Sequence, residues 1–126
     1  MLVAGENMAK WRGIKVNKLG RCVKVDWHGR SLTGPLPAEL LELTELTELN
    51  LTGNKLSGEI PLDIGKLSNL TNLNLKETGI VGVLPPSLAG LAKLEKLALQ
   101  GNEGLVRAPS VGLYSKDAVQ AYLATL

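Results

Sequence analysis

The sequence has no phenylalanine, one cysteine and one histidine, and aromatic residues make up only 3% of it. A lone cysteine, Cys22, excludes an internal disulfide and is typical of a reducing compartment. The single histidine, His28, has no second histidine or cysteine near it in the pattern, which argues against a metal site. We therefore expect a cytoplasmic protein that holds no metal ion and no cofactor.

Excess charge and long apolar runs are also missing. The 14 basic and 12 acidic residues are interspersed and leave a net charge of +2, which gives no electrostatic case for binding nucleic acid or an anionic membrane. No apolar run approaches the roughly 20 residues that span a bilayer, so we expect no membrane insertion. The first ten residues, MLVAGENMAK, lack the pattern of a secretory signal. A length of 126 residues favours one domain.

Leucine is abundant and recurs with a period of 24 residues. Residues 46–69 read LTELNLTGNKLSGEIPLDIGKLSN, and residues 70–93 repeat the core apolar positions, Gly58 and Pro61 without a gap. Residues 22–45 follow the same template with Cys22 and Trp27 in two leucine slots, and a partial repeat starts at Leu94. A fixed period of this length predicts a solenoid.

Each repeat predicts a strand, a turn and a return segment. Leu49 and Leu51 alternate with polar residues, which indicates a half-buried strand, and strands of successive coils then form a parallel sheet. Asn54 can satisfy backbone groups of the turn, since its amide both donates and accepts. The return segment, residues 62–66, is long enough only for a short 3₁₀ turn.

Both ends depart from the template, as the ends of a solenoid must. Two alternating runs, Gly13–Val16 and Arg21–Trp27, flank the turn residues Asn17–Gly20 and predict a hairpin. We interpret residues 11–21 as an N-terminal cap, with Trp11 over the first coil, and residues 1–10 as a lead-in, either a frayed helix or an addition to the natural sequence.

We assign residues 22–109 to the repeats, although Leu105 falls one residue late and Gly104 is the expected insertion. The tail, residues 110–126, changes to a helical period. Apolar residues at helical spacing and Ser115 as N-cap predict a capping helix over Lys116–Leu126. The apolar stripe consists of Val119, Tyr122, Leu123 and Leu126.

These repeats resemble the leucine-rich repeat family, in its plant-type 24-residue subclass with the pattern LxxLxLxxNxLxGxIPxxLxxLxx. The resemblance implies an α/β right-handed solenoid with a short parallel β-sheet on the concave face, 3₁₀ and turn segments on the convex face, an N-terminal β-hairpin cap and a C-terminal helix cap. Two departures stand at the Asn54 position, where the neighbouring repeats have Arg30 and Thr78, so we expect less uniform turns there. The tail is more weakly similar to the junction between repeats and the GTPase domain of Roco-type proteins.

This fold usually binds partners on its concave face, so the outward residues of the strands are the candidate site. They form a polar strip of mixed charge without aromatic residues, since Trp27 stands in a core slot. A solvated sheet face with no partner would show the same pattern. The candidate partner-binding residues are Lys24, Asp26, His28, Glu48, Asn50, Thr52, Asn72, Asn74, Lys76, Lys96 and Gln100.

Other motifs are weaker. No nucleophile and base can be assembled around His28, so we expect no catalytic residues and no enzyme. Cys22 replaces a leucine and predicts a buried, inert thiol. Gly65 and Lys66 lack the spacing of a phosphate loop. Asn50 and Asn69 each begin an N-glycosylation triplet, which matters only in a secreted protein.

We expect a non-catalytic module that binds a protein or peptide, within a larger signalling or defence protein. The alternative is a regulatory segment that packs in cis against a Roco-type GTPase domain at its C-terminal side.

Overall fold

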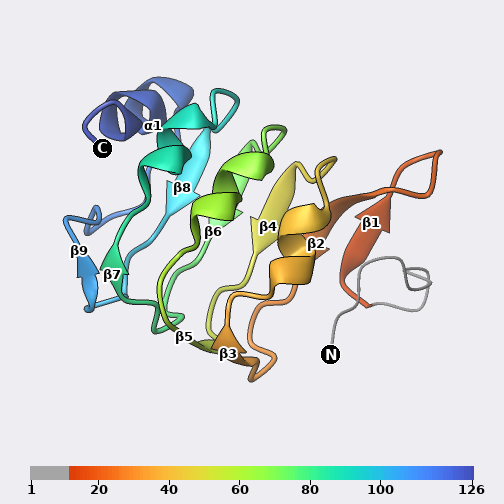
Figure 1. The fold of residues 1–126 in the computed structure, drawn as a ribbon, viewed down its shortest axis with the longest axis horizontal. Coiled ribbons are helices and arrows are strands. Elements are labelled where there is room, and N and C mark those ends of the chain that lie inside the picture. The colour runs from red at the N-terminus through yellow and green to blue at the C-terminus, as the bar shows by residue number, and fades with distance from the viewer. Residues whose placement is uncertain (1–11) are drawn as a thin grey trace.

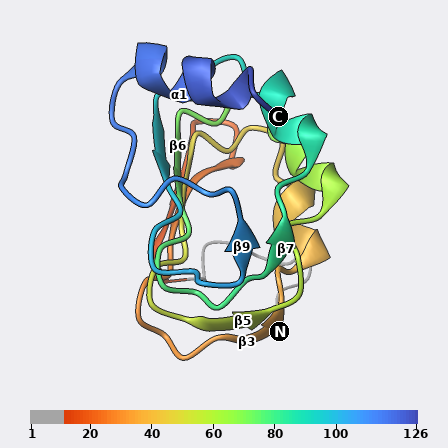
Figure 2. The ribbon, with the colours of Figure 1, turned by 90° about the vertical axis from the view of Figure 1, so that its left-hand side faces the viewer.

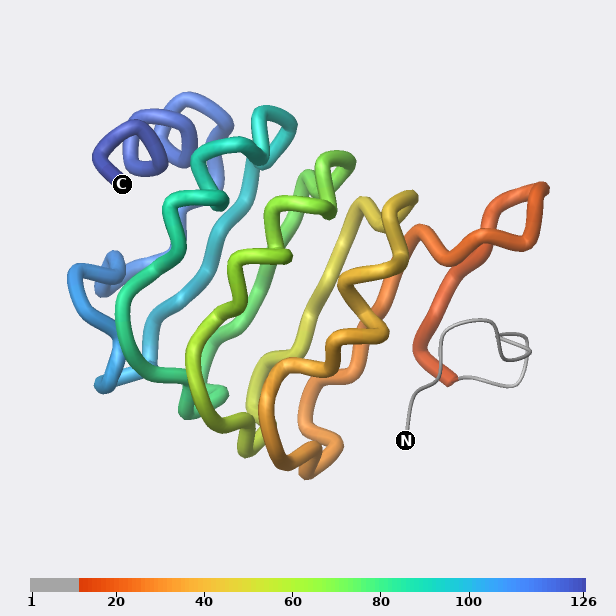
Figure 3. Tube along the Cα trace, viewed as in Figure 1, coloured from red at the N-terminus to blue at the C-terminus, as the bar shows by residue number. Residues whose placement is uncertain are grey.

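The computed structural model describes residues 12–126, so the expected position of Trp11 and the lead-in lie outside the described residues. The chain winds into a short solenoid whose coils stack side by side from the N-terminal to the C-terminal end (Figures 1 and 3). Seen along the stack, a sheet forms one side, 3₁₀ helices form the other, and short strands close the lower edge (Figure 2). This is the predicted leucine-rich-repeat fold.

The main sheet has the order β1-β2-β4-β6-β8. Its strands are β1 (Ile14–Val16), β2 (Cys22–Asp26), β4 (Glu48–Asn50), β6 (Asn72–Asn74) and β8 (Lys96–Ala98). The four repeat strands are parallel and pair 24 residues apart, as Lys24 with Glu48, Glu48 with Asn72, and Asn72 with Lys96. The sequence period therefore sets the register of the sheet.

The return side carries the 3₁₀ helices η2 (Ala38–Glu42), η3 (Leu62–Lys66) and η4 (Pro86–Gly90). Each follows a proline in extended conformation, Pro37, Pro61 or Pro85. Proline restricts the residue before it and cannot donate a backbone hydrogen bond, so each helix begins at a fixed point. The predicted bounds of 62–66 are those observed.

Two small parallel sheets are formed by the chain segments that follow the strands of the main sheet. One pairs β3 (Thr33–Pro35) with β5 (Lys55–Ser57), and the other pairs β7 (Gly82–Val83) with β9 (Leu105–Val106). The late position of Leu105 places it opposite Gly82, and a side chain on Gly104 would collide with Val81. The extra residue is thus accommodated at a glycine that touches its neighbouring coil.

The core is a stack of leucines between the sheet and the 3₁₀ helices. Val25, Leu49, Leu73 and Leu97 stand in register on successive strands and are each at most 1% exposed. Because every coil contributes the same layer, each coil buries its apolar side only against its neighbours. Cys22 and Trp27 are buried in leucine slots, as predicted, at 2% and 5% exposure.

The N-terminal end is a hairpin of β1 and β2, antiparallel, with Asn17 at its turn. Asn17 Oδ1 accepts hydrogen bonds from the backbone N–H groups of Leu19 and Arg21. The indole N–H of Trp27 donates to the carbonyl of Arg12 at 2.6 Å and ties the hairpin to the first coil. The expected hairpin is therefore present.

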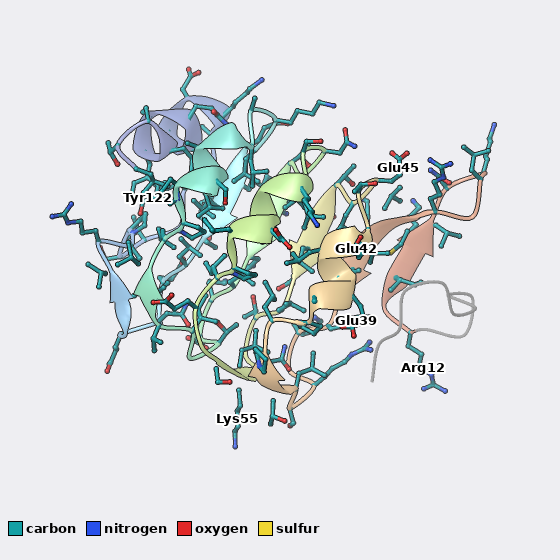
Figure 4. All side chains as sticks on the ribbon, viewed as in Figure 1. Arg12, Glu39, Glu42, Glu45, Lys55 and Tyr122 are labelled. Atoms are coloured by element: carbon teal, nitrogen blue, oxygen red, sulfur yellow. The ribbon has the colours of Figure 1, made fainter. Side chains whose placement is uncertain are left out.

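At the other end, helix α1 (Lys116–Leu123) covers the last coil. Ser115 is its N-cap and accepts from the N–H of Ala118, and Val119 and Leu123 are buried. The helix ends at Leu123 and not at Leu126, which is 38% exposed. Tyr122, labelled in Figure 4, donates from its hydroxyl to the carbonyl of Arg107, so the helix is fastened to the loop after β9.

Candidate functional site

The outward side chains of β2, β4, β6 and β8, with the residues just after them, form one polar surface, which we call the polar strip. Lys24, Glu48, Asn72 and Lys96 make up its first row across the strands. The second row is Asp26, Asn50, Asn74 and Ala98, and the third is His28, Thr52, Lys76 and Gln100. Because strands of a sheet lie about 4.8 Å apart, each row brings its side chains within mutual reach.

In the first two coils the charged side chains of the strip each contact a polar neighbour. Lys24 Nζ lies 3.4 Å from Glu48 Oε1, and His28 Nδ1 lies 2.6 Å from Asp26 Oδ1. The hydrogen bond from His28 holds the pKa of the Asp26 carboxyl below its usual value. These groups are about half exposed, so each contact contributes little to stability. This half of the strip carries charge of both signs.

The centre of the strip is a fixed hydrogen-bond network. Asn50 Oδ1 accepts from the N–H of Thr52, and Asn74 Oδ1 accepts from the N–H of Lys76 and, at 2.7 Å, from the hydroxyl of Thr52. Over residues 12–126, no group accepts a hydrogen bond from Nδ2 of Asn50 or Asn74. Two amide donors therefore remain for a ligand in positions fixed by their own oxygens.

The fourth coil differs from the prediction. Ala98 is only 3% exposed although it stands in an outward row, and Gln100 Oε1 is shut off from solvent without a donor among the described residues. The segment between β9 and α1 crosses to this side of the molecule (Figure 2), and Leu113 forms an antiparallel bridge with Leu97. Gln100 is therefore a weaker candidate than the sequence indicated, whereas Lys96 stays exposed.

Sequence reasoning missed Tyr114, which is 61% exposed and adjoins this bridge. Leu113 matches no repeat position, so the period could not place it on the sheet. The only available signal was the alternation of Gly112, Leu113 and Tyr114. It fits a short strand in which Leu113 points to the core and its two neighbours point to the other face.

The other motifs occupy separate places. The thiol of Cys22 is buried, and desolvation raises its pKa, which agrees with an inert cysteine. The triplet residue Asn50 lies on the strip, while Asn69 lies before β6 and donates to the carbonyl of Thr44. No group of three or more histidine, cysteine, aspartate or glutamate side chains able to hold a metal occurs in the part of the chain that the structure describes.

A hollow of about 240 Å³ lies beside the strip, between the start of β2 and η2, and Cys22 and Thr44 belong to its lining. Glu42 and Glu45 mark this side of the first coil in Figure 4. Arg21 and Glu45, which both line the hollow, form an ion pair with each other at 3.0 Å. Its volume is below the roughly 300–1,000 Å³ of small-molecule sites, so the strip is the better candidate.

Comparison with known proteins supports the fold. The leucine rich repeat family model matches residues 44–103. The ectodomain of the receptor kinase SOBIR1 from Arabidopsis thaliana is similar at 29% identity and a TM-score of 0.68, over 75% of this chain and 56% of that one. The BIR2 ectodomain from Arabidopsis thaliana gives 28% identity and a TM-score of 0.71, over 75% of this chain and 51% of that one.

The plant peptide hormone receptor RGFR1, in complex with RGF2, gives 25% identity and a TM-score of 0.59, over 76% of this chain and 22% of that one. The chain thus spans about half the length of the first two ectodomains. No curated protein matches it in sequence.

These similarities overturn one expectation. The predicted cytoplasmic location is wrong, because the similar SOBIR1 and BIR2 structures are ectodomains, and this similarity argues against a cytoplasmic location. The number of cysteines indicates only whether disulfides can form. Stacked leucines and buried asparagines stabilise this core without a disulfide. Among residues 12–126, no helix is long and apolar enough to cross a membrane.

Proposed function

We propose that this chain, whose residues 44–103 match the leucine rich repeat family model, is a non-catalytic recognition module that binds an extended peptide or protein segment on its polar strip. The observation that carries the proposal is the network of Asn50, Thr52 and Asn74. It fixes two amide donors on a rigid sheet, and amide donors in fixed positions suit the carbonyl groups of an extended backbone.

The candidate residues named from the sequence remain part of this proposal, with Gln100 the least accessible. The 24-residue register supports placing the repeats in the plant-type subclass. The peptide hormone receptor among the similar structures supports a peptide as the partner class. Signalling or defence is then the context in which such a module acts.

The alternative of a segment packed in cis against a GTPase domain has less support. The two ectodomain structures described above, of SOBIR1 and BIR2, favour a recognition module over this alternative.

The test is affinity selection from a phage-displayed library of random 12-residue peptides on the immobilised chain. Asn72→Trp adds a bulky uncharged ring to the middle of the strip, while Leu62→Trp adds the same group to η3, where Leu62 is 68% exposed. We expect selected peptides to lose binding to the Asn72 variant, because the ring blocks the approach of a backbone, and to keep binding to the Leu62 variant. Peptides that respond to Leu62→Trp alone would refute the strip as the binding surface.

A further inference from the structure

The tail extends the first row of the strip by one aromatic residue. Leu97 and Leu113 exchange both backbone hydrogen bonds, each 2.8 Å long. Directly opposed residues of an antiparallel pair point to the same face, and Leu113 packs against the core as Leu97 does. The flanking residues therefore face the strip, with Tyr114 beside Lys96 and Gly112 beside Ala98.

Gly112 positions the ring of Tyr114. A Cβ added at Gly112 would lie 2.6 Å from Cε2 of Tyr114 and would also meet Cζ and the hydroxyl oxygen. The ring thus lies across Gly112, next to the buried Ala98, yet Tyr114 is 61% exposed. Its hydroxyl has no hydrogen-bond partner between residues 12 and 126. One face of the ring rests on the protein and the rest is open to a ligand.

The three rows of the strip carry charge of one sign near Tyr114. In the third and fourth coils the three rows contain Lys76 and Lys96 and no carboxylate. Neither lysine lies within ion-pair distance of a carboxylate in the described chain, unlike Lys24 in the first coil. Glu77 follows in the turn, outside the rows. The strip therefore has an N-terminal half that contains the carboxylates Asp26 and Glu48, and a basic C-terminal half that ends at Tyr114.

We propose that Tyr114, Lys76 and Lys96 form an anchor for an extended acidic peptide, with an aromatic or aliphatic residue on the ring and carboxylates at the two lysines. This inference rests on the proposed peptide-binding function and assigns its partner class and orientation. Charge complementarity selects the acidic partner, since the lysines have no carboxylate of their own. Tyrosine is among the residues that most often dominate a binding interface.

The experiment uses peptides selected on the native chain, synthesised with fluorescein and measured by fluorescence anisotropy. We expect the selected sequences to be rich in aspartate and glutamate near one apolar residue. Tyr114→Ala should weaken binding about thirtyfold, and Tyr114→Phe should change it less than about threefold, because the ring supplies the contact. Gly112→Ala should weaken binding as well, since its methyl group displaces the ring without removing it.

Lys76→Glu and Lys96→Glu should each weaken binding about tenfold at low salt, with a smaller effect at high salt. Leu19→Ala, at the hairpin turn where Leu19 is 76% exposed, is the matched control and should bind as the native chain. Thermal melts establish that each variant is folded before its affinity is compared.

Two outcomes overturn the inference and leave the proposed function standing. One is a set of peptides that Asn72→Trp blocks but Tyr114→Ala and Gly112→Ala do not. The other is selection of basic peptides. Failure to select any peptide that depends on the strip overturns the proposed function and this inference together.

Discussion

Asn54 completes the turn around Arg30, one coil before it. Its Oδ1 accepts the backbone N–H groups of Arg30 and Leu32 at 3.0 and 3.1 Å, and its Nδ2 donates to the carbonyls of Trp27 and Leu51 at 2.8 and 2.7 Å. Asn102 serves the turn at Thr78 in the same way. In these two pairs of coils one asparagine forms hydrogen bonds with the backbone of its own turn and of the preceding turn. The turn at Arg30 is therefore stabilised through its backbone groups and does not require an asparagine side chain at position 30.

Asn54→Ala should therefore cost far more stability than Arg30→Ala. Asn54 is 4% exposed and makes four hydrogen bonds, so its removal should lower the free energy of unfolding by about 3 kcal/mol. Within residues 12–126 the Arg30 side chain donates only to the carbonyl of Arg12, at an exposed position, and its removal should cost about 0.5 kcal/mol or less. Urea unfolding of both variants checks this. Equal losses would show that the turn at Arg30 does not depend on Asn54.

Glu77→Gly should stabilise the chain. Glu77 has φ +53°, whereas Gly29, Gly53 and Gly101 occupy the corresponding positions of the other coils with φ between +61° and +79°. A left-handed conformation costs an L-residue about 1–2 kcal/mol. Glycine avoids this cost, but its greater freedom in the unfolded state offsets about half of the gain. We expect a net gain of about 0.5–1 kcal/mol in thermal or urea unfolding.

Lys76→Gly is the control for this change, because Lys76 is not among the residues with positive φ. It should lose about 1 kcal/mol. If both glycine variants are destabilised alike, the left-handed backbone at Glu77 stores no strain.

Cys22 should resist alkylation in the folded chain. Burial raises the pKa of its thiol above the ordinary 9.0, so the thiolate is scarce at neutral pH. The residue is also only 2% exposed, so a reagent cannot reach it. The stability that this thiol contributes is present below the ordinary pKa and is lost as pH rises through the higher folded pKa. Iodoacetamide labelling followed by mass spectrometry should show reaction only in denaturant. Cys22→Ala should remove that part of the alkaline stability loss, and an unchanged alkaline profile would contradict it.

The pair of Asp26 and His28 should be visible as an acid titration. Because the hydrogen bond from His28 lowers the pKa of Asp26 below 3.8, its contribution is present above that value and is lost as pH falls through the lowered pKa. The side chain of Asp26 is 55% exposed, so the effect on stability is small. Carboxyl-carbon NMR measures the pKa directly. His28→Ala should raise it, and an unshifted titration would exclude His28 as the cause.

The sequence was sufficient where one residue type has one role in every coil. Leu49, Leu73 and Leu97 predicted the strands and their register, and the prolines before η3 and η4 predicted the return side. It was not sufficient where pairing departs from the period. Thr33–Pro35 contains glycine and proline and pairs with Lys55–Ser57 at an offset of 22 residues, so that sheet was not expected.

The placement of the candidate residues on one face was predictable for the same reason, and the prediction was incomplete where the chain departs from the period. Asn50 and Asn74 could be placed on one face from their spacing alone, but their bonds to Thr52 and Lys76 depend on side-chain torsions that a pattern does not contain. Tyr114 reaches the strip because the tail reverses direction, and nothing in a repeat predicts a reversal.

The bridge between Leu97 and Leu113 also fixes how this molecule could be lengthened. It occupies the edge of β8 with a strand of opposite direction, so a further parallel coil cannot pair there. Additional 24-residue units would have to enter between existing coils, each widening the sheet by about 4.8 Å. Inserted between β4 and β6, they would separate the half that contains Asp26 and Glu48 from the basic half and leave Tyr114 beside Lys96. The length of the polar strip could therefore change while the proposed anchor stays intact.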